Sequence, residues 1–349
     1  ESQAIRSRWA SRWQGIDHRW RMGLRLRGPN SRRLREIVET GRTHGLFDFR
    51  PCWLVNPGTV SQVFPFQPGL FDVVVFDEAS QCPPEYALPA MFRGKRVIVA
   101  GDGKQLPPTM FFKSALSLDM EEPSDEEAER AGDQIDLDIS AGAEDLLSLA
   151  QARLPDAYLN VHYRSLDPIL VAFSNAAFYQ NQLEAPVPAR PLAQPDGSPA
   201  LFLERVDGVY QANRTNPKEA RRVVEYLRSL WADPSADHPT IGVVTFNEAQ
   251  REAIQDLLEA QSTLNHDFRM AYERELTRTK DGQDVGFFVK SLEAVQGDER
   301  DVILFSTTYG RRDDGRFVRS FLGPINQQGG ERRLNVAITR AKLWVRIFT

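Results

Sequence analysis

Residues 71–81 read FDVVVFDEASQ, and this stretch decides the fold. Its valines and phenylalanines form a continuous apolar run, typical of a strand that a parallel sheet buries on both faces. Asp77 and Glu78 follow the run directly. Because ligands bind outside the carboxyl ends of parallel strands, both carboxylates stand where a nucleotide would bind. One could hold Mg²⁺ on a phosphate while the other orients a water; the alternative is a strand ending in solvated acids.

The composition is that of a globular protein of about two domains. The chain has 349 residues, of which 41% are hydrophobic and 26% are charged. No run of about 20 apolar residues predicts a membrane span, and no secretory leader is visible. The first residue, Glu1, is not Met, which suggests a fragment or a processed product. Cys52 and Cys82 lack CxxC spacing, which argues against zinc or a disulfide scaffold and favours a cytoplasmic location.

Two segments carry unbalanced charge. Residues 1–50 contain twelve arginines, no lysine and five acidic residues, and residues 1–48 are predicted to form a basic helical segment. These arginines fit either a nucleic-acid-binding arm or the solvated face of a helix, and the second interpretation is favoured. Residues 119–138 contain ten acidic residues and one arginine, which predicts a flexible surface insertion.

Strand-like and helix-like segments alternate along the rest of the chain, which predicts an α/β fold with largely parallel sheets. Asn216 and Pro217 are the expected cap and first residue of one helix. Helices are expected over 143–154, 167–179, 216–231 and 247–261, and strands over 51–56, 73–76, 96–101, 157–164, 241–246, 287–289, 301–307 and 343–348.

A second polar strand end is found in GDGKQLPPT, residues 101–109. Its Gln105 could contact a γ-phosphate or position an attacking water, as a glutamine does in some nucleotide hydrolases. Pro107 and Pro108 stiffen the segment that follows. The alternative is an ordinary polar loop.

Three further motifs contribute basic side chains or a glycine turn. They are LNVHYRS (159–165), VKSLEAVQGDERDVILFS (289–306) and RRLNVAITRAK (332–342). An arginine supplied by a second domain can stabilise the charge on a transferring phosphoryl group. Taken alone, each arginine would be interpreted as a surface residue or an ion-pair partner.

In this order and at these spacings, the motifs resemble those of the superfamily 1 helicases. The similarity is to the DEAS-box branch, which includes the nonsense-mediated-decay helicase and large bacterial multidomain helicases. FDEASQ resembles motif II, the Walker B element, and GDGKQLPPT resembles motif III. HYRS resembles the motif that opens the second lobe, and VVTFNEAQ, SLEAVQGDE and LNVAITRAK resemble motifs IV, V and VI.

The resemblance implies two RecA-like P-loop-NTPase lobes. Residues 49–150 would be the remainder of the first lobe, with the acidic insertion, and residues 151–349 would be the second. It implies that Asp77 holds Mg²⁺ and that Glu78 is the base that activates water. Gln105 would sense the γ-phosphate, and Arg164 and Arg340 would reach the phosphates from the second lobe.

The resemblance also implies contacts with the rest of the nucleotide and with nucleic acid. Tyr163 would lie against the adenine, and Gln296, Gly297 and Glu299 would approach the nucleotide. Short polar side chains at strand ends suit contacts with a nucleic-acid backbone. The candidates for that role are Thr59, Thr109, Thr245, Asn247 and Ser291.

One element of the family is absent from this sequence. A P-loop requires GxxxxGK[ST], but Gly-Lys occurs only at 94–95 and 103–104, without the rest of that pattern. In such families the P-loop strand is expected between the strands of motifs II and III, so a gap in the sheet is expected here. Either the P-loop lies upstream in a longer protein, which is favoured, or the sheet closes differently.

The resulting expectation is the carboxyl-terminal part of an ATP-dependent helicase or translocase motor. It would use ATP and Mg²⁺ to move along a single strand, with DNA favoured over RNA as the partner. The chain alone is expected to be inactive without a Walker A motif. The alternative is a non-hydrolysing module that binds nucleic acid or protein. A nuclease finds no support here and could reside only in a domain outside this chain.

Overall fold

The computed structural model describes residues 34–43, 45–105, 145–188, 192–233, 237–317, 325 and 330–349. The predictions for the basic segment before residue 34, for the acidic insertion and for Thr109 lie outside these residues. The chain divides into two compact units, Glu1–Gly103 with Ala141–Pro155 and Lys104–Ser140 with Asp156–Thr349. Within the described residues, no helix has the length and apolar character needed to span a membrane.

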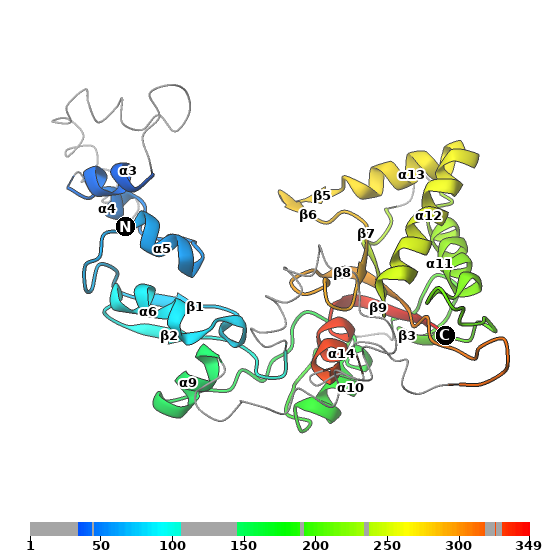
Figure 1. Ribbon diagram of the computed structural model, residues 1–349, viewed down its shortest axis with the longest axis horizontal. Coiled ribbons are helices and arrows are strands. Elements are labelled where there is room, and N and C mark those ends of the chain that lie inside the picture. Colours follow the sequence, from blue (N-terminus) through cyan, green and yellow to red (C-terminus); the bar gives the residue numbers. More distant parts are fainter. Residues whose placement is uncertain are drawn as a thin grey trace. The chain divides into compact units, whose positions relative to one another are not determined.

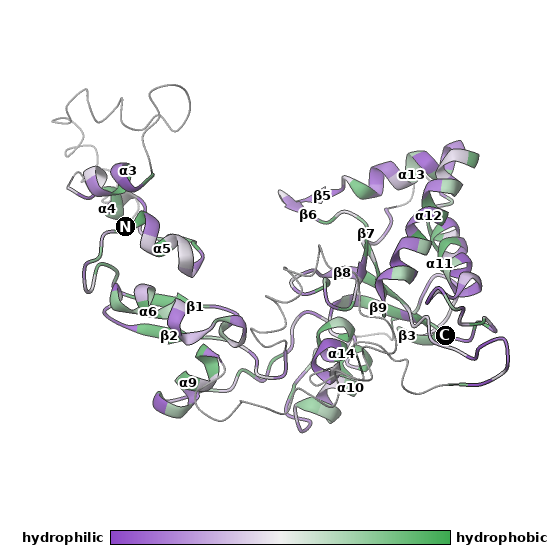
Figure 2. Ribbon diagram, viewed as in Figure 1, coloured by the Kyte–Doolittle hydropathy of each residue, from purple (hydrophilic) through white to green (hydrophobic). Residues whose placement is uncertain are grey.

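Unit 1 is a small β–α–β arrangement with additional helices. Strands β1 (Val74–Phe76) and β2 (Val97–Val99) are parallel neighbours, and helix α6 (Pro84–Phe92) connects them after the short 3₁₀ helix η1 (Ala79–Gln81). The remaining helices are α3 (Leu34–Arg42), α4 (Leu46–Phe49), α5 (Pro57–Val63) and α9 (Leu146–Arg153). Figure 1 shows the order of these elements, and the apolar character of β1, β2 and α6 is visible in Figure 2.

The expected gap between the strands of motifs II and III is wrong. Val74 pairs with Val97 and Phe76 with Val99, so the two strands share one hydrogen-bonded ladder. The physical reason is the short connection through α6, because strands joined by a compact crossover usually lie side by side. A further strand in this sheet would therefore pair at an outer edge.

The expectation that the VVVF strand is buried on both faces is also wrong. Phe76 packs into a cluster with Val60, Phe64 and Leu147. On the other face Val75 is 61% exposed, and Ile98 of β2 is 54% exposed. In the described part of the chain this sheet has two strands and is covered on one face, which leaves its other face apolar and bare.

Unit 2 is built on a five-stranded parallel sheet in the order β3-β9-β8-β4-β7. The strands are β3 (Leu201–Glu204), β4 (Ile241–Thr245), β7 (Phe288–Ser291), β8 (Arg300–Ser306) and β9 (Ala341–Phe348). A small hairpin of β5 (Thr279–Lys280) and β6 (Gln283–Asp284) turns at Asp281-Gly282, where both residues have positive φ. The α/β fold class with a largely parallel sheet is thereby confirmed.

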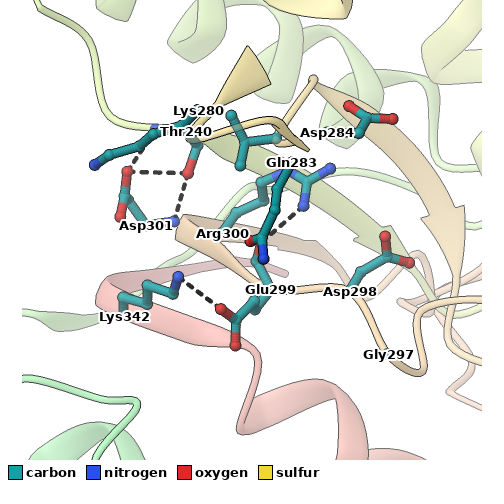
Figure 3. Close-up of a pocket in the computed structure, with 11 residues that line it drawn as sticks. Thr240, Lys280, Gln283, Asp284, Gly297, Asp298, Glu299, Arg300, Asp301 and Lys342 are labelled. Atoms are coloured by element: carbon teal, nitrogen blue, oxygen red, sulfur yellow. Dashed lines mark hydrogen bonds and ion pairs between the residues drawn. The ribbon is translucent and has the colours of Figure 1, made fainter. Parts of the chain in front are cut away.

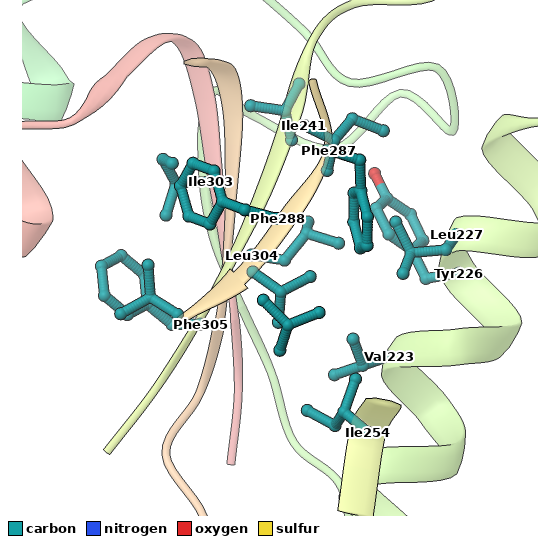
Figure 4. Close-up of a cluster of buried hydrophobic side chains, with 14 of the residues drawn as sticks. Val223, Tyr226, Leu227, Ile241, Ile254, Phe287, Phe288, Ile303, Leu304 and Phe305 are labelled. Carbon is teal, nitrogen blue, oxygen red and sulfur yellow. The ribbon is translucent and has the colours of Figure 1, made fainter. Parts of the chain in front are cut away.

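Helices cover this sheet and give unit 2 its core. α11 (Pro217–Leu230) presents Ala220, Val223, Val224 and Leu227 at helical spacing, and all four are buried. With α12 (Glu248–Leu264) it packs on β4, β7, β8 and β9, and Figure 4 shows the resulting cluster around Phe305 and Ile254. α10 (Ile169–Phe178) contacts β9 and α14 (Gly330–Ile338), and α13 (His266–Leu276) extends from α12.

Asn216 caps α11 as predicted, accepting a hydrogen bond from the Glu219 N–H at 3.2 Å. Two of the expected strands do not form. Residues 51–56 lead as irregular chain into α5, which Asn56 caps, and residues 157–164 contain only the isolated bridge Val161–Glu184. Leu54 and Leu159 are strongly exposed, so these apolar letters lack a sheet to bury them.

A fully buried carboxylate lies where α11 meets the carboxyl end of β8. Oε1 of Glu219 accepts hydrogen bonds from Ser306 Oγ (2.6 Å) and from Thr308 N (2.8 Å), while Asn216 Nδ2 is 3.4 Å from Oε2. The side chain has no solvent exposure. Burial raises the pKa of the Glu219 carboxyl from 4.5 to about 7, although the hydrogen bonds from Ser306 and Thr308 oppose that rise.

The substitution Glu219→Gln tests how this carboxyl couples stability to pH. The folded carboxyl binds its proton more tightly than the unfolded one, so its stabilising contribution is complete below pH 4.5 and is lost as the pH rises through about 7. Each pKa unit corresponds to about 1.4 kcal/mol. The unfolding free energy of the wild type should therefore fall relative to Glu219→Gln by on the order of 3 kcal/mol between pH 4.5 and pH 8.

Urea unfolding at a series of pH values measures this difference. Glu225→Gln is the matched control, because Glu225 is an exposed glutamate on the same helix. The Glu225→Gln curve should run parallel to the wild type. Parallel curves for Glu219→Gln and the wild type would contradict the prediction.

Candidate functional site

The predicted acidic pair of unit 1 follows the last residue of β1. Glu78 adopts a left-handed backbone conformation, with φ of 53° and ψ of 41°, which non-glycine residues rarely adopt. Its N–H donates to Asp77 Oδ1 at 3.0 Å, and its Oε2 accepts from Gln81 Nε2 at 3.1 Å. A strained residue held by two hydrogen bonds is common at functional sites. Gln81, which was not predicted, therefore orients the Glu78 carboxylate.

The donor set around Asp77 fits Mg²⁺ when phosphate oxygens are also present. Within the described ranges, no group of three or more histidine, cysteine, aspartate or glutamate side chains could hold a metal ion unaided. Mg²⁺ is commonly bound by one or two carboxylates together with waters and substrate phosphates. Asp77 and Glu78 are both exposed at the strand end, as such an arrangement requires.

Gly101 packs directly under the turn that carries the acidic pair. A Cβ atom at Gly101 would lie 3.0 Å from Ala79 N and 3.1 Å from Ser80 N. The Ala79 N–H donates to the Ala100 carbonyl at 2.9 Å, which fixes the turn against β2. The residue at 101 therefore sets the position of the segment that holds Asp77 and Glu78.

Gln105 is assigned to unit 2, as the end of the GDGKQ segment. The carbonyl of the neighbouring Lys104 accepts a hydrogen bond from Asn335 Nδ2 of α14 at 3.0 Å. This hydrogen bond connects the segment that resembles motif III with the helix of the motif that resembles motif VI. Gln105 itself stays a predicted γ-phosphate contact.

Unit 2 gathers the predicted phosphate-binding residues at the amino edge of its sheet. Arg164 Nε lies 2.7 Å from Glu299 Oε2, and Lys342 Nζ lies 2.7 Å from Glu299 Oε1. Arg340, whose Nε donates to the Val336 carbonyl at 2.7 Å, immediately precedes β9. Gly297, Glu299 and Lys342 line a polar pocket of about 340 Å³, shown in Figure 3.

The HYRS segment is fixed against the start of β9. Ser165 Oγ donates to the Ala341 carbonyl at 2.9 Å and lies 3.0 Å from His162 Nε2, and Leu166 N donates to the Lys342 carbonyl. Burial and the nearby charges of Arg164 and Arg340 lower the pKa of His162. The turn leaves Tyr163 83% exposed, so its ring is accessible for stacking on a planar ligand.

The predicted nucleotide-contacting turn of Gln296 and Gly297 has two features of a binding loop. Gly297 has a φ of +84°, a conformation that favours glycine. Gln296 Oε1 and Nε2 are buried and have no hydrogen-bond partner among the described residues. Such atoms are costly unless a ligand or water satisfies them.

The predicted nucleic-acid residues lie elsewhere, and several of them have structural roles. Thr245 and Ser291 end β4 and β7 at the carboxyl edge of the unit 2 sheet, opposite the edge where Glu299 lies. Thr245 is fully buried, and Asn247 caps α12 by accepting from Gln250 N at 2.8 Å. Thr59 lies in the first turn of α5. Their contact with nucleic acid stays a prediction.

Sequence reasoning missed Gln81, Glu219 and Lys342. Gln81 and Lys342 are letters of the quoted motifs FDEASQ and LNVAITRAK, so their signal was present. Glu219 is an acidic residue next to the apolar stripe of α11, which resembles a solvated position until the register of β8 is known.

Comparison with known proteins agrees with this geometry. A family profile described as an AAA domain matches residues 144–348, and a second profile with the same description matches residues 58–113. An uncharacterized ATP-dependent helicase of Mycoplasma genitalium, MG140, is 38% identical over 301 residues, which is 85% of this chain and 25% of the relative. The chain belongs to the superfamily 1 helicases.

More distant helicases of the same branch also match. The helicase SEN1 of Saccharomyces cerevisiae is 26% identical over 289 residues, covering 79% of this chain and 11% of the relative. The ATP-dependent helicase upf1 of Schizosaccharomyces pombe is 27% identical over 293 residues, covering 79% and 26%. The chain is a helicase motor domain, and it spans about a quarter of the length of its Mycoplasma relative.

The substitution Gly101→Ala tests whether the turn under the acidic pair requires glycine. The added methyl would meet the backbone nitrogens of Ala79 and Ser80, which cannot rotate away as a side chain can. Overpacking of this kind typically costs about 1–3 kcal/mol. We expect a loss of that size in the unfolding free energy of unit 1, measured by urea titration.

Gly103→Ala is the matched control, since a Cβ there would meet no atom within 4 Å. It should leave stability unchanged or raise it slightly, because alanine restricts the unfolded chain. Equal effects of the two substitutions would show that the turn does not depend on Gly101.

Proposed function

We propose that this helicase motor domain is the carboxyl-terminal part of an ATP-driven motor that moves along single-stranded nucleic acid. The observation that carries the proposal is the cationic amino edge of unit 2, where Arg164, Arg340 and Lys342 gather around the pocket of Glu299. A polyphosphate is the ligand class that such a cluster suits.

In the proposed mechanism each predicted residue has one task. Asp77 holds Mg²⁺, which would supply charge neutralisation on the β- and γ-phosphates when bound. Glu78, oriented by Gln81, accepts a proton from the attacking water, and Gln105 positions that water or senses the γ-phosphate. Arg164 and Arg340 stabilise the negative charge that develops on the transferring group. Tyr163 stacks on the adenine, while Gln296, Gly297 and Glu299 approach the nucleotide.

The P-loop of this motor would come from another part of a longer polypeptide. The bare apolar face at Val75 and Ile98 supports this proposal, as does the quarter of the Mycoplasma relative's length that the chain spans. The two-stranded sheet of unit 1 then represents the remainder of an incomplete RecA-like lobe, as expected from the missing GxxxxGK[ST] pattern. A nuclease-like domain outside this chain and a cytoplasmic location are proposed as well.

Single-stranded DNA is the favoured track, with RNA as the alternative. Thr245 and Ser291 are proposed to face it from the carboxyl edge of unit 2, with Thr59, Thr109 and Asn247 as further contacts. The residues 292–299 connect that edge with the turn of Glu299. A hydrolysis-driven change at Glu299 therefore has a short covalent route to the proposed track.

Two ATPase measurements test the proposal. The longer polypeptide that carries both this chain and a P-loop should hydrolyse ATP with stimulation by single-stranded DNA. Glu78→Gln should lower its kcat by about 10²–10⁴, the range for loss of a general base. Asp72→Asn is the control, because Asp72 is an exposed acid that pairs with Lys95 shortly before the same strand.

The 349-residue chain alone should hydrolyse ATP no faster than its own Glu78→Gln variant, because it lacks the Walker A lysine. DNA-stimulated hydrolysis by this chain that Glu78→Gln abolishes would contradict the need for an external P-loop. Binding of DNA by the longer polypeptide without hydrolysis would instead favour the non-hydrolysing module.

A further inference from the structure

One carboxylate at the amino edge of unit 2 is shared by two cations. The two oxygens of Glu299 each contact one cation, Arg164 Nε at 2.7 Å and Lys342 Nζ at 2.7 Å. Figure 3 shows the Lys342 side chain reaching toward Glu299 at one wall of the pocket. Lys342 was not among the predicted site residues, and it enters the site through this shared contact.

The cluster carries more positive than negative charge. Arg340 lies two residues before Lys342, and the charges of both Arg164 and Arg340 act on His162. Lysine and arginine contacts also hold the pKa of Glu299 below its ordinary value, although burial would raise it. Three cations around one ionised carboxylate suit an anion with several charges better than a single carboxylate.

The ion pairs of Glu299 are exchangeable. The side chains of Arg164, Glu299 and Lys342 are 30%, 41% and 38% exposed, and water screens ion pairs at such sites. A phosphate oxygen offers each cation a charge-assisted hydrogen bond of the same kind, with higher charge density. A polyphosphate in the adjoining pocket would therefore compete with Glu299 for both partners.

We propose that Lys342 is a further phosphate-binding residue of the motor, and that Glu299 is the counter-ion that holds Lys342 and Arg164 until a polyphosphate replaces it. This inference rests on the proposed function, because it assigns a second task to a residue that was predicted only to approach the nucleotide. It makes Glu299 a competitor of the phosphate chain as well as a neighbour of the nucleotide.

The test is calorimetric binding of inorganic tripolyphosphate to the 349-residue chain at low ionic strength. Tripolyphosphate has no sugar or base, so the loss of any contact between Glu299 and a ribose cannot mask the effect. Glu299→Gln should bind more tightly than the wild type, by up to about fivefold, the range for release of an exposed ion pair. Lys342→Met should bind more weakly by a similar factor, and Lys342→Arg should restore binding.

Two variants in the same pocket are matched controls. Lys280→Met removes a pocket-lining lysine, and Asp284→Asn removes a pocket-lining acid. Both should bind tripolyphosphate as the wild type does. Thermal unfolding without ligand checks that all variants fold alike.

Several results would overturn the inference. Glu299→Gln might leave affinity unchanged or reduce it, or Asp284→Asn could raise it equally, which would indicate a general charge effect. Equal losses for Lys342→Met and Lys280→Met, or no binding by any variant, would also refute it. None of these results decides the proposed function, which depends on ATP hydrolysis by the longer polypeptide and on Glu78.

Discussion

The parallel pairing of β8 with β4 on one side and β9 on the other is the constraint on which unit 2 depends. Its register places Arg300 beside Ala341 at one edge and Ser306 beside Thr245 at the other. Basic residues that begin strands are thereby collected at the amino edge, and small polar residues that end strands at the carboxyl edge. The generic rule that ligands bind at carboxyl ends describes the acids of unit 1, whereas the cations of unit 2 occupy the opposite edge.

The parts of the fold that were predictable are those where local signals agree with burial. The helix after Asn216 has a cap, a proline at its first position and an apolar stripe, and β4 and β8 are continuous apolar runs. Residues 51–56 and 157–164 have strand-like composition without a partner strand, and hydrogen-bonded neighbours decide whether a strand forms. β3 was missed because its four residues follow a segment rich in proline and gain their place only by pairing with β9.

The candidate site was predictable as a set of motifs and not as a set of contacts. Arg164, Glu299 and Arg340 were found because each belongs to a recognisable segment. Their mutual arrangement depends on the HYRS turn being fixed on the carbonyls of Ala341 and Lys342. The side-chain hydrogen bond that orients Glu78 follows from a left-handed backbone at that residue, which no letter of the sequence announces.

The bare face of the unit 1 sheet has a consequence for handling this chain in solution. In the described residues, β1 and β2 pair with each other, which leaves each strand one outer edge with unpaired backbone groups beside Val75 and Ile98. Exposed apolar strand edges are templates for pairing with another chain. Self-association of the isolated chain should therefore begin in unit 1, while the five-stranded sheet of unit 2, covered by helices, remains inert.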